Sequence, residues 1–524
     1  MIQPNAVSFS SMAGKYLLTT LGCKVNQYES QQIRELMESF GLQAVQPGET
    51  ADFAVVNTCA VTTTASRKNR QAVRAAARNP GTSVIVVGCG ATAEADRLAK
   101  LDGVTAVVGH QADVLSELRS LLTSRFAPTS STRGETTSKH RNVSRNEVWI
   151  KPTDSTPQRS SILPLAFDAS PRSIPPTLPI VKSPDTLAAR IESFRGRQRA
   201  FLKVQDGCDA SCTYCIIPQL RPRLRSKPVS VVVAEAQTLV ANGHKEIIIT
   251  GIFLGAYGRD TAIRKRFTSK GSPLAEMVCA LAKVEGLHRL RLSSLEPGDV
   301  DDALLEVLAA GGCCVPHLHL PLQSGSSSLL RRMNRQYTRD QYVDMVERVH
   351  RALDRPAIST DIIVGFPGET ETDFQASIEV ARSTGFCKIH AFPFSPRPGT
   401  AAARWSKTYV HSTEVRERMR RMAEVERECS LDFRRRFIGE VERVIVESPC
   451  GTPEGAGGRQ ARFSLQDEDL RSICHGRADR YFEIHFESDA ERHAGDIVAV
   501  RIDRVTPTRT HGTAVEAPAR QVAP

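Results

Sequence analysis

The sequence predicts a multidomain α/β protein with an N-terminal α/β domain, a full or partial TIM-type barrel and a small C-terminal β-barrel. First, 524 residues are too many for one ordinary hydrophobic core. Second, apolar strands alternate with helices over two separate stretches, which is typical of parallel sheets. Third, a group of short alternating strands near the C-terminal end favours a small barrel.

The first domain is expected over residues 15–124. Strands are predicted at Tyr16–Leu21, Asp52–Asn57, Ser83–Val87 and Ala106–Val108, and helices at Gln31–Phe40 and Arg67–Arg78. Apolar strands separated by amphipathic helices indicate one parallel sheet with helices against it.

Residues 125–199 have a different composition. They are rich in Ser, Thr, Pro and Arg without a sustained period, so we expect a largely disordered linker or insertion. Most of the net charge of +11 falls here, with 13 Lys and Arg against 6 Asp and Glu over residues 125–200. Such a stretch is either a solvated basic loop or an arm that binds RNA.

The strand–helix alternation resumes over residues 200–436. Six strands are predicted, at Ala200–Val204, Glu246–Thr250, His288–Ser293, His317–Leu320, Ala357–Val364 and Lys388–Phe392. A barrel built from such units carries its chemistry at the carboxyl ends of its strands. A β-barrel is expected over residues 437–506 and a disordered tail over residues 507–524.

The cysteine content suggests metal binding. The N-terminus has no secretory signal, and no apolar run is long enough to cross a bilayer, so we expect a cytoplasmic protein. Disulfides would be unusual in that setting. The 13 cysteines are therefore interpreted as reduced thiols, some of them metal ligands.

Cys208, Cys212 and Cys215 form a C-x3-C-x2-C motif directly after a predicted strand. Three thiolates so close in sequence can hold three irons of a cubane cluster and leave the fourth iron open to a small molecule. The alternative is a zinc site, but zinc usually takes four ligands in two knuckles, and no second knuckle follows at suitable spacing.

Three further cysteines follow predicted strands of the first domain: Cys23 in TLGCKVNQ, Cys59 in VVNTCAVT and Cys89 in VVGCGA. The carboxyl ends of parallel strands converge on one crevice, so these thiols could carry a second cluster. Taken singly, each could equally be an ordinary buried cysteine.

Together these motifs resemble the radical S-adenosylmethionine methylthiotransferases. The resemblance rests on TLGCKVNQYES, NTCAVT and CDASCTYCIIP, and it covers nearly all of the chain outside the 125–199 segment and the two ends. It implies an N-terminal methylthiotransferase domain, a radical S-adenosylmethionine barrel and a C-terminal TRAM barrel associated with RNA binding.

The resemblance also implies cofactors, a partner and a site. Two 4Fe–4S clusters are expected, an auxiliary one on the Cys23, Cys59 and Cys89 trio and a cofactor-cleaving one on the Cys208, Cys212 and Cys215 trio. S-adenosylmethionine would be contacted by Tyr214, Gly251, Glu296, Gln323, Ser324 and Asp361. The partners implied are the anticodon arm of tRNA and an electron donor that the sequence does not identify.

Within the family, KVNQ after Cys23 favours the branch that methylthiolates C2 of N(6)-threonylcarbamoyladenosine next to the anticodon. The alternatives are isopentenyladenosine in tRNA, an aspartate of a ribosomal protein, and a non-catalytic RNA-binding protein with a metal site. One departure stands out: the segment QLRPRLRS after CIIP lacks the glycine of the family's Arg/Gly-rich turn.

Overall fold

The computed structural model describes residues 14–110, 113–126, 149–150, 187, 189–266, 271–448 and 473–516. Most of the predicted linker and the last residues of the predicted tail lie outside this part of the chain. None of the described helices is long and apolar enough to cross a membrane.

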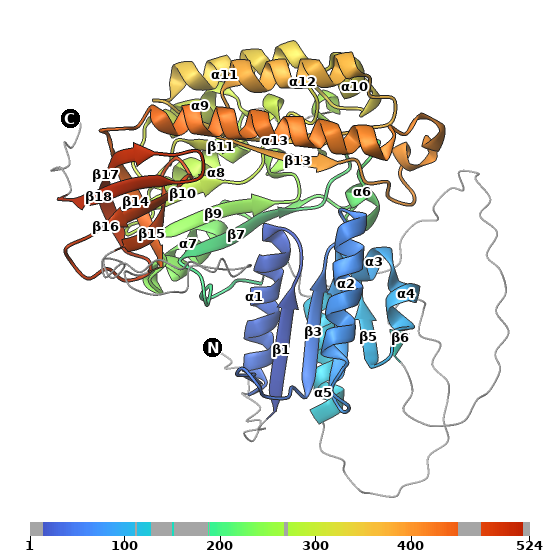
Figure 1. Ribbon diagram of the computed structural model, residues 1–524. Coiled ribbons are helices and arrows are strands. Elements are labelled where there is room, and N and C mark those ends of the chain that lie inside the picture. Colours follow the sequence, from blue (N-terminus) through green and yellow to red (C-terminus); the bar gives the residue numbers. More distant parts are fainter. Residues whose placement is uncertain are drawn as a thin grey trace, which may run out of the picture.

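The N-terminal domain is a sheet with helices on both faces (Figure 1). The strand order is β2-β1-β3-β4-β5-β6. The strands are β1 (Lys15–Thr20), β2 (Gln43–Ala44), β3 (Phe53–Thr58), β4 (Ser83–Gly88), β5 (Val104–Val108) and the antiparallel edge β6 (Trp149–Ile150). The helices are α1 (Lys24–Ser39), α2 (Thr63–Ala76), α3 (Cys89–Ala93), α4 (Ala95–Ala99) and α5 (Val114–Phe126).

Alternate residues of β3 bury their side chains on opposite faces of this sheet. Val55 packs in one core with α1 and α5, while Val56 packs in the other with α2 and α4. The first helix begins at Lys24, earlier than the predicted Gln31, because the chain turns into α1 directly after Cys23.

The central domain is a partial barrel of six parallel strands. They are β7 (Arg199–Asp206), β9 (Glu246–Gly251), β10 (Arg289–Leu292), β11 (His317–His319), β12 (Ala357–Val364) and β13 (Lys388–Pro393). Two sheets, β10-β9-β7-β8 and β11-β12-β13, are joined by parallel bridges between Leu290 and Cys314 and between Ser294 and His319. The short β8 (Arg225–Ser226) is antiparallel to β7. The predicted barrel is confirmed in its partial form.

Helices cover the outer face of this barrel (Figure 1). They are α7 (Val229–Ala241), α8 (Pro273–Ala282), α9 (Asp302–Ala309), α10 (Ser327–Arg332), α11 (Arg339–Ala352), α12 (Glu371–Thr384) and α13 (Ser412–Arg435). The short α6 (Ile217–Leu220) lies instead at the carboxyl end of β7, in contact with α3 (Figure 1).

The predicted boundary of the linker at residue 199 is wrong. Leu187, Ile191 and Phe194 are buried, and the last two belong to the core of the central domain. Tyr28 of α1 donates a hydrogen bond to the Ala189 carbonyl at 3.1 Å. The chain therefore rejoins the fold by Leu187, because its apolar side chains there fill the space between α1 and the barrel.

The C-terminal domain is a closed barrel in the order β14-β15-β16-β18-β17, consistent with a TRAM domain. The strands are β14 (Val441–Ser448), β15 (Ile473–Ala478), β16 (Glu483–Glu487), β17 (Ile497–Val505) and β18 (Thr510–Val515). The predicted tail from residue 507 is therefore wrong over its first part. β18 closes the barrel by pairing with both β16 and β17. Residues 517–524 lie outside the described part.

The N-terminal domain contacts both edges of the partial barrel. On one side α1 packs against β7. On the other side the Thr63 amide donates to Ser395 Oγ at 2.9 Å, and Arg397 Nη1 donates to Ser66 Oγ at 3.0 Å. The C-terminal barrel lies at the opposite end of β7 and β9 from α6 (Figure 1).

Candidate active site with two cysteine trios

The first trio lies at the carboxyl ends of three neighbouring parallel strands. Cys23 follows β1 and stands at the N-cap of α1, Cys59 follows β3, and Cys89 follows β4 as the first residue of α3. Cys59 and Cys89 are buried and Cys23 is exposed. The placement at strand ends is as the sequence predicts.

Buried amide side chains hold these loops in place. Asn69 of α2 brackets Cys59: its Oδ1 accepts from the Cys59 amide at 3.2 Å and its Nδ2 donates to the Cys59 carbonyl at 2.7 Å. Asn26 of α1 donates to the carbonyls of Leu21 and Thr58 at 2.8 and 2.9 Å. The loops that carry Cys23 and Cys59 are thus fixed to each other and to two helices.

The second trio lies on the loop that follows β7. Gly207 turns the chain there with a φ of +82°, and a Cβ on it would lie 1.8 Å from the Arg223 carbonyl oxygen. The Cys208 amide then donates to the Arg221 carbonyl at 2.9 Å. Gln205 steadies the same turn, because its Nε2 donates to the carbonyls of Asp206 and Gly207.

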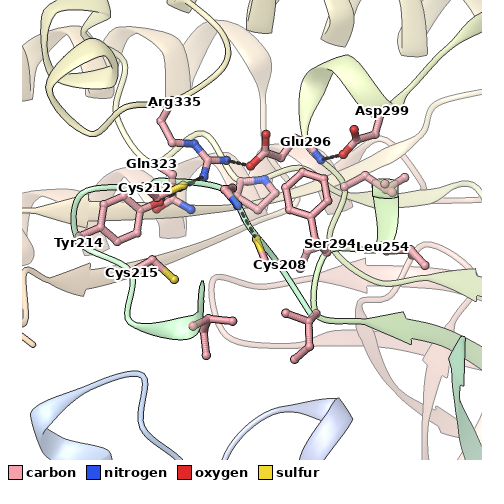
Figure 2. A pocket seen from close by; sticks show the side chains of 17 residues that line it. Cys208, Cys212, Tyr214, Cys215, Leu254, Ser294, Glu296, Asp299, Gln323 and Arg335 are labelled. Atoms are coloured by element: carbon pink, nitrogen blue, oxygen red, sulfur yellow. Dashed lines mark hydrogen bonds and ion pairs between the residues drawn. The ribbon is translucent and has the colours of Figure 1, made fainter. Parts of the chain in front are cut away.

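A pocket of about 170 Å³ opens beside this trio (Figure 2). All three cysteines line it, as do Tyr214, Glu296 and Gln323 among the residues predicted to contact S-adenosylmethionine. Backbone and apolar groups of residues 252–255 form another part of its wall.

The other three predicted contacts do not line this pocket. Ser324 is fully buried, and its hydroxyl accepts from the Ser326 amide at 3.2 Å. Gly251 leaves room for Gln205, whose Oε1 would lie 2.9 Å from a Cβ at that position. Asp361 pairs instead with His319 Nε2 at 3.3 Å.

Arg335 is a pocket residue that sequence reasoning missed. Figure 2 shows its guanidinium between Cys212 and Glu296. Its Nη1 donates to Cys212 Sγ at 3.3 Å, and it forms an ion pair with Glu296. Arg264 also pairs with Glu296, at 2.9 Å. Arg335 is one of three arginines in RRMNRQ, and no motif or periodicity in the sequence distinguishes it from the other two.

Arg221 was also missed, although the basic segment QLRPRLRS was noted as a departure from the family pattern. Its Nη1 and Nη2 donate to the two carboxylate oxygens of Glu29 at 2.8 Å each, and Nη1 also donates to Asp206 at 2.8 Å. Burial alone would raise the pKa of Glu29, but Arg221 and Lys203 hold it well below its usual value. This charge network joins the N-terminal domain to the barrel.

The thiols suit metal ligation. Burial raises the pKa of Cys208 and of Cys215 to about 12 and that of Cys89 to about 11, so these thiols are protonated at neutral pH until a metal displaces the proton. Soft thiolates are the ligands that iron–sulfur clusters take. Within the described residues, no three His, Cys, Asp or Glu side chains converge on a single ion.

Comparison with known proteins agrees with this architecture. Residues 202–381 match the family model of the Radical SAM superfamily, and residues 15–109 match that of the Uncharacterized protein family UPF0004. The chain is 30% identical to the threonylcarbamoyladenosine tRNA methylthiotransferase MtaB of Chlamydia pneumoniae, over 95% of this chain and 98% of the relative. It is 32% identical to the Bacillus subtilis MtaB, over 92% of each chain.

A relative of a second type is equally similar. The tRNA-2-methylthio-N(6)-dimethylallyladenosine synthase of Frankia casuarinae is 33% identical, over 97% of this chain and 84% of the relative. Fold and site thus define a radical S-adenosylmethionine enzyme, a transferase that uses this cofactor and 4Fe–4S clusters. The chain belongs to the family of tRNA methylthiotransferases.

Proposed function

We propose that this enzyme methylthiolates C2 of N(6)-threonylcarbamoyladenosine next to the anticodon of tRNA. In this proposal the Cys23, Cys59 and Cys89 trio holds the auxiliary cluster, and the Cys208, Cys212 and Cys215 trio holds the cluster that cleaves S-adenosylmethionine. One observation carries the assignment. Ala60, next to Cys59, and Cys89 share a buried cluster with Ile216 and Leu220, one and five residues after Cys215.

The target C–H bond explains why such cofactors are needed. The C2–H bond of adenine is strong, and no side-chain acid or base breaks it at neutral pH. The bound clusters and S-adenosylmethionine supply radical chemistry for that step. The chain's own residues would bind the cofactor, orient it and keep water from a reactive site.

The pocket beside the second trio supports a place for S-adenosylmethionine. Tyr214, Glu296 and Gln323 line it with polar atoms, while Ile252 and Leu254 add apolar wall. Arg335 fixes Glu296 from one side and Arg264 fixes it from the other. A carboxylate held in this way can accept hydrogen bonds from a cationic or hydroxyl-bearing ligand without moving.

Lys24 supports the choice of nucleoside. It directly follows Cys23 as the first residue of α1, and Asp361 and Arg291 are among the charged groups near its ammonium. The threonylcarbamoyl group carries a carboxylate at neutral pH, whereas the isopentenyl group is uncharged and apolar. A lysine beside the sulfur-donating trio therefore favours the anionic substituent.

The test compares two substrates on one enzyme. Reconstituted protein, S-adenosylmethionine and dithionite are incubated with anticodon stem-loops that carry either threonylcarbamoyladenosine or isopentenyladenosine, and nucleosides are measured by mass spectrometry. We expect the methylthio product from the first substrate only. The Lys24→Met variant should reduce that product while leaving cofactor cleavage intact.

Other outcomes would reassign the function. Product from the isopentenyl stem-loop alone would move the enzyme to the other tRNA branch. Product on a ribosomal-protein peptide and on neither RNA would point to an aspartate substrate. A protein that takes up no iron and sulfide would instead be a non-catalytic RNA-binding protein.

A further inference from the structure

One buried arginine contacts both cysteine trios. Arg221 is 4% exposed, and its Nε donates a hydrogen bond to Cys89 Sγ at 3.3 Å. Its backbone carbonyl accepts the amide of Cys208 at 2.9 Å. Cys89 belongs to the N-terminal domain and Cys208 to the barrel, so this residue spans the junction between them.

The guanidinium of Arg221 has little freedom to turn. Glu29 binds it through both carboxylate oxygens, and Asp206 adds a contact of 2.8 Å to Nη1. His110 accepts from Nη2 through its Nε2 at 2.6 Å. With both terminal nitrogens committed to oxygen and imidazole partners, Nε is directed at the sulfur of Cys89.

The charges around Arg221 are balanced. Lys203 donates to Glu29 and to Asp206 at 2.8 and 2.9 Å, so two cations face two carboxylates in this buried network. Arg225 reaches Asp206 from the outside at 3.4 Å. Such a network positions Arg221 firmly, because losing any one charge would leave another unpaired in a low-dielectric interior.

We infer that Arg221 is a positioning residue that raises the reduction potential of the auxiliary cluster through its hydrogen bond to Cys89. This inference rests on the proposed function, which assigns Cys89 to that cluster. A hydrogen bond to a ligand sulfur withdraws electron density from it and so stabilises the reduced, more negative cluster. The side chain of Arg221 contacts Cys89 of the first trio, and its backbone carbonyl accepts the amide of Cys208 in the second trio. The same residue therefore helps to order both sites.

The first experiment isolates the auxiliary cluster. The full chain with Cys208→Ala, Cys212→Ala and Cys215→Ala retains only the first trio. These substitutions also remove the sulfur that Arg335 contacts. After reconstitution with iron and sulfide, the midpoint potential is followed by electron paramagnetic resonance. Arg221→Lys and Arg221→Gln should both lower this potential.

The matched control is Arg225→Lys. Arg225 also contacts Asp206, through Nη2 at 3.4 Å, but its side chain is 43% exposed. Its substitution should leave the potential unchanged. An unshifted potential in both Arg221 variants would overturn the inference, since a merely structural residue alters stability without altering the potential.

A second measurement needs no substitution at Arg221. The same triple-alanine protein is grown with 15N-arginine, and pulsed electron paramagnetic resonance of the reduced cluster should detect a coupled 15N nucleus. Absence of that coupling would contradict the hydrogen bond. If the triple-alanine protein holds no iron, the proposed assignment of the first trio to a cluster is wrong. Iron content thus separates failure of the proposed function from failure of the inference about Arg221.

Discussion

At the scale of single residues, amide and guanidinium side chains form specific hydrogen bonds around the six cysteines. Asn26 and Asn69 hold backbone groups of the first trio's loops, and arginines approach one sulfur of each trio, Cys89 and Cys212. Burial raises the pKa of the Cys89, Cys208 and Cys215 thiols, so these three stay protonated until metal binds.

The two trios should therefore be separable by substitution. We expect Cys212→Ala to abolish cleavage of S-adenosylmethionine, because it removes a ligand of the proposed cleaving cluster. Cys59→Ala should leave some cleavage but stop methylthiolation. The measurements are 5′-deoxyadenosine by chromatography and methylthio-nucleoside by mass spectrometry. Cys279→Ala, outside both trios, is the control. Methylthiolation by the Cys59→Ala variant would refute the role of the first trio.

At the scale of elements, turns after strands place the six cysteines. The loop after β7 begins at Gly207, whose φ of +82° is in the left-handed region and whose missing Cβ admits the Arg223 carbonyl. The sequence contains 34 glycines, and nothing in it distinguishes Gly207 from the others.

The prediction for this turn is specific to Gly207. Gly207→Ala should lower the free energy of unfolding by at least about 1–3 kcal/mol and reduce the iron content of the Cys208 trio. Gly243→Ala is the control, because Gly243 has a φ of +91° with open space around it. Iron analysis and thermal unfolding check both variants. Equal iron loss in the two would show that strain alone, rather than the clash with Arg223, decides the outcome.

The contact between α1 and the barrel should depend on pH. Burial lowers the pKa of His110 to about 4, below its ordinary value of 6.5, and the neighbouring Arg221 adds to this. The folded protein therefore binds this proton less readily than the unfolded chain. Stability should be complete above about pH 6.5 and fall as the pH drops toward 4, by up to about 1.4 kcal/mol per pH unit.

Thermal unfolding between pH 4 and 8 measures this dependence. His110→Gln, which keeps an acceptor for Arg221, should flatten the curve. His493→Gln changes an exposed histidine and should leave the slope unchanged. The assignment to His110 would be wrong if the slope survives the first substitution.

At the scale of the whole molecule, buried ion pairs join the three domains. Glu246 of β9 pairs with Arg289 at 3.1 Å and Arg291 at 2.9 Å. These arginines in turn donate to carbonyls of the C-terminal barrel, Arg289 to Arg477 and Ala478, and Arg291 to Asp479. The barrel expected to grip RNA is thereby held at a fixed position relative to the site.

Breaking this junction should be costly. Glu246→Gln removes the charge between two buried arginines and should lower the free energy of unfolding by about 3–5 kcal/mol. It should also weaken tRNA binding, because the two arginines that hold the C-terminal barrel lose the carboxylate that they share. Glu440→Gln, which removes the partner of Arg355 in a half-exposed pair, should cost under about 1 kcal/mol. Denaturant titration and RNA filter binding test both.

Sequence by itself determined the class of fold, the six cysteines and their position at strand ends. Apolar periodicity and motif spacing are local properties, so strands, turns and ligand triplets can be recognised along the chain. The family resemblance added the cofactors and the reaction class. The same local signals failed where partners are distant: β18, which closes the C-terminal barrel, looked like a tail because its pairing strands lie elsewhere.

Only the tertiary structure decided which polar residues meet at the site. Arg221 and Glu29 are 192 positions apart, and nothing in either segment indicates the other. Ser324 lies in the loop after β11 and Asp361 lies within β12, yet their side chains turn to Ser326 and His319 rather than to the pocket beside Cys208. The direction in which such a side chain points depends on how the neighbouring strands pack, and the local sequence does not encode that packing.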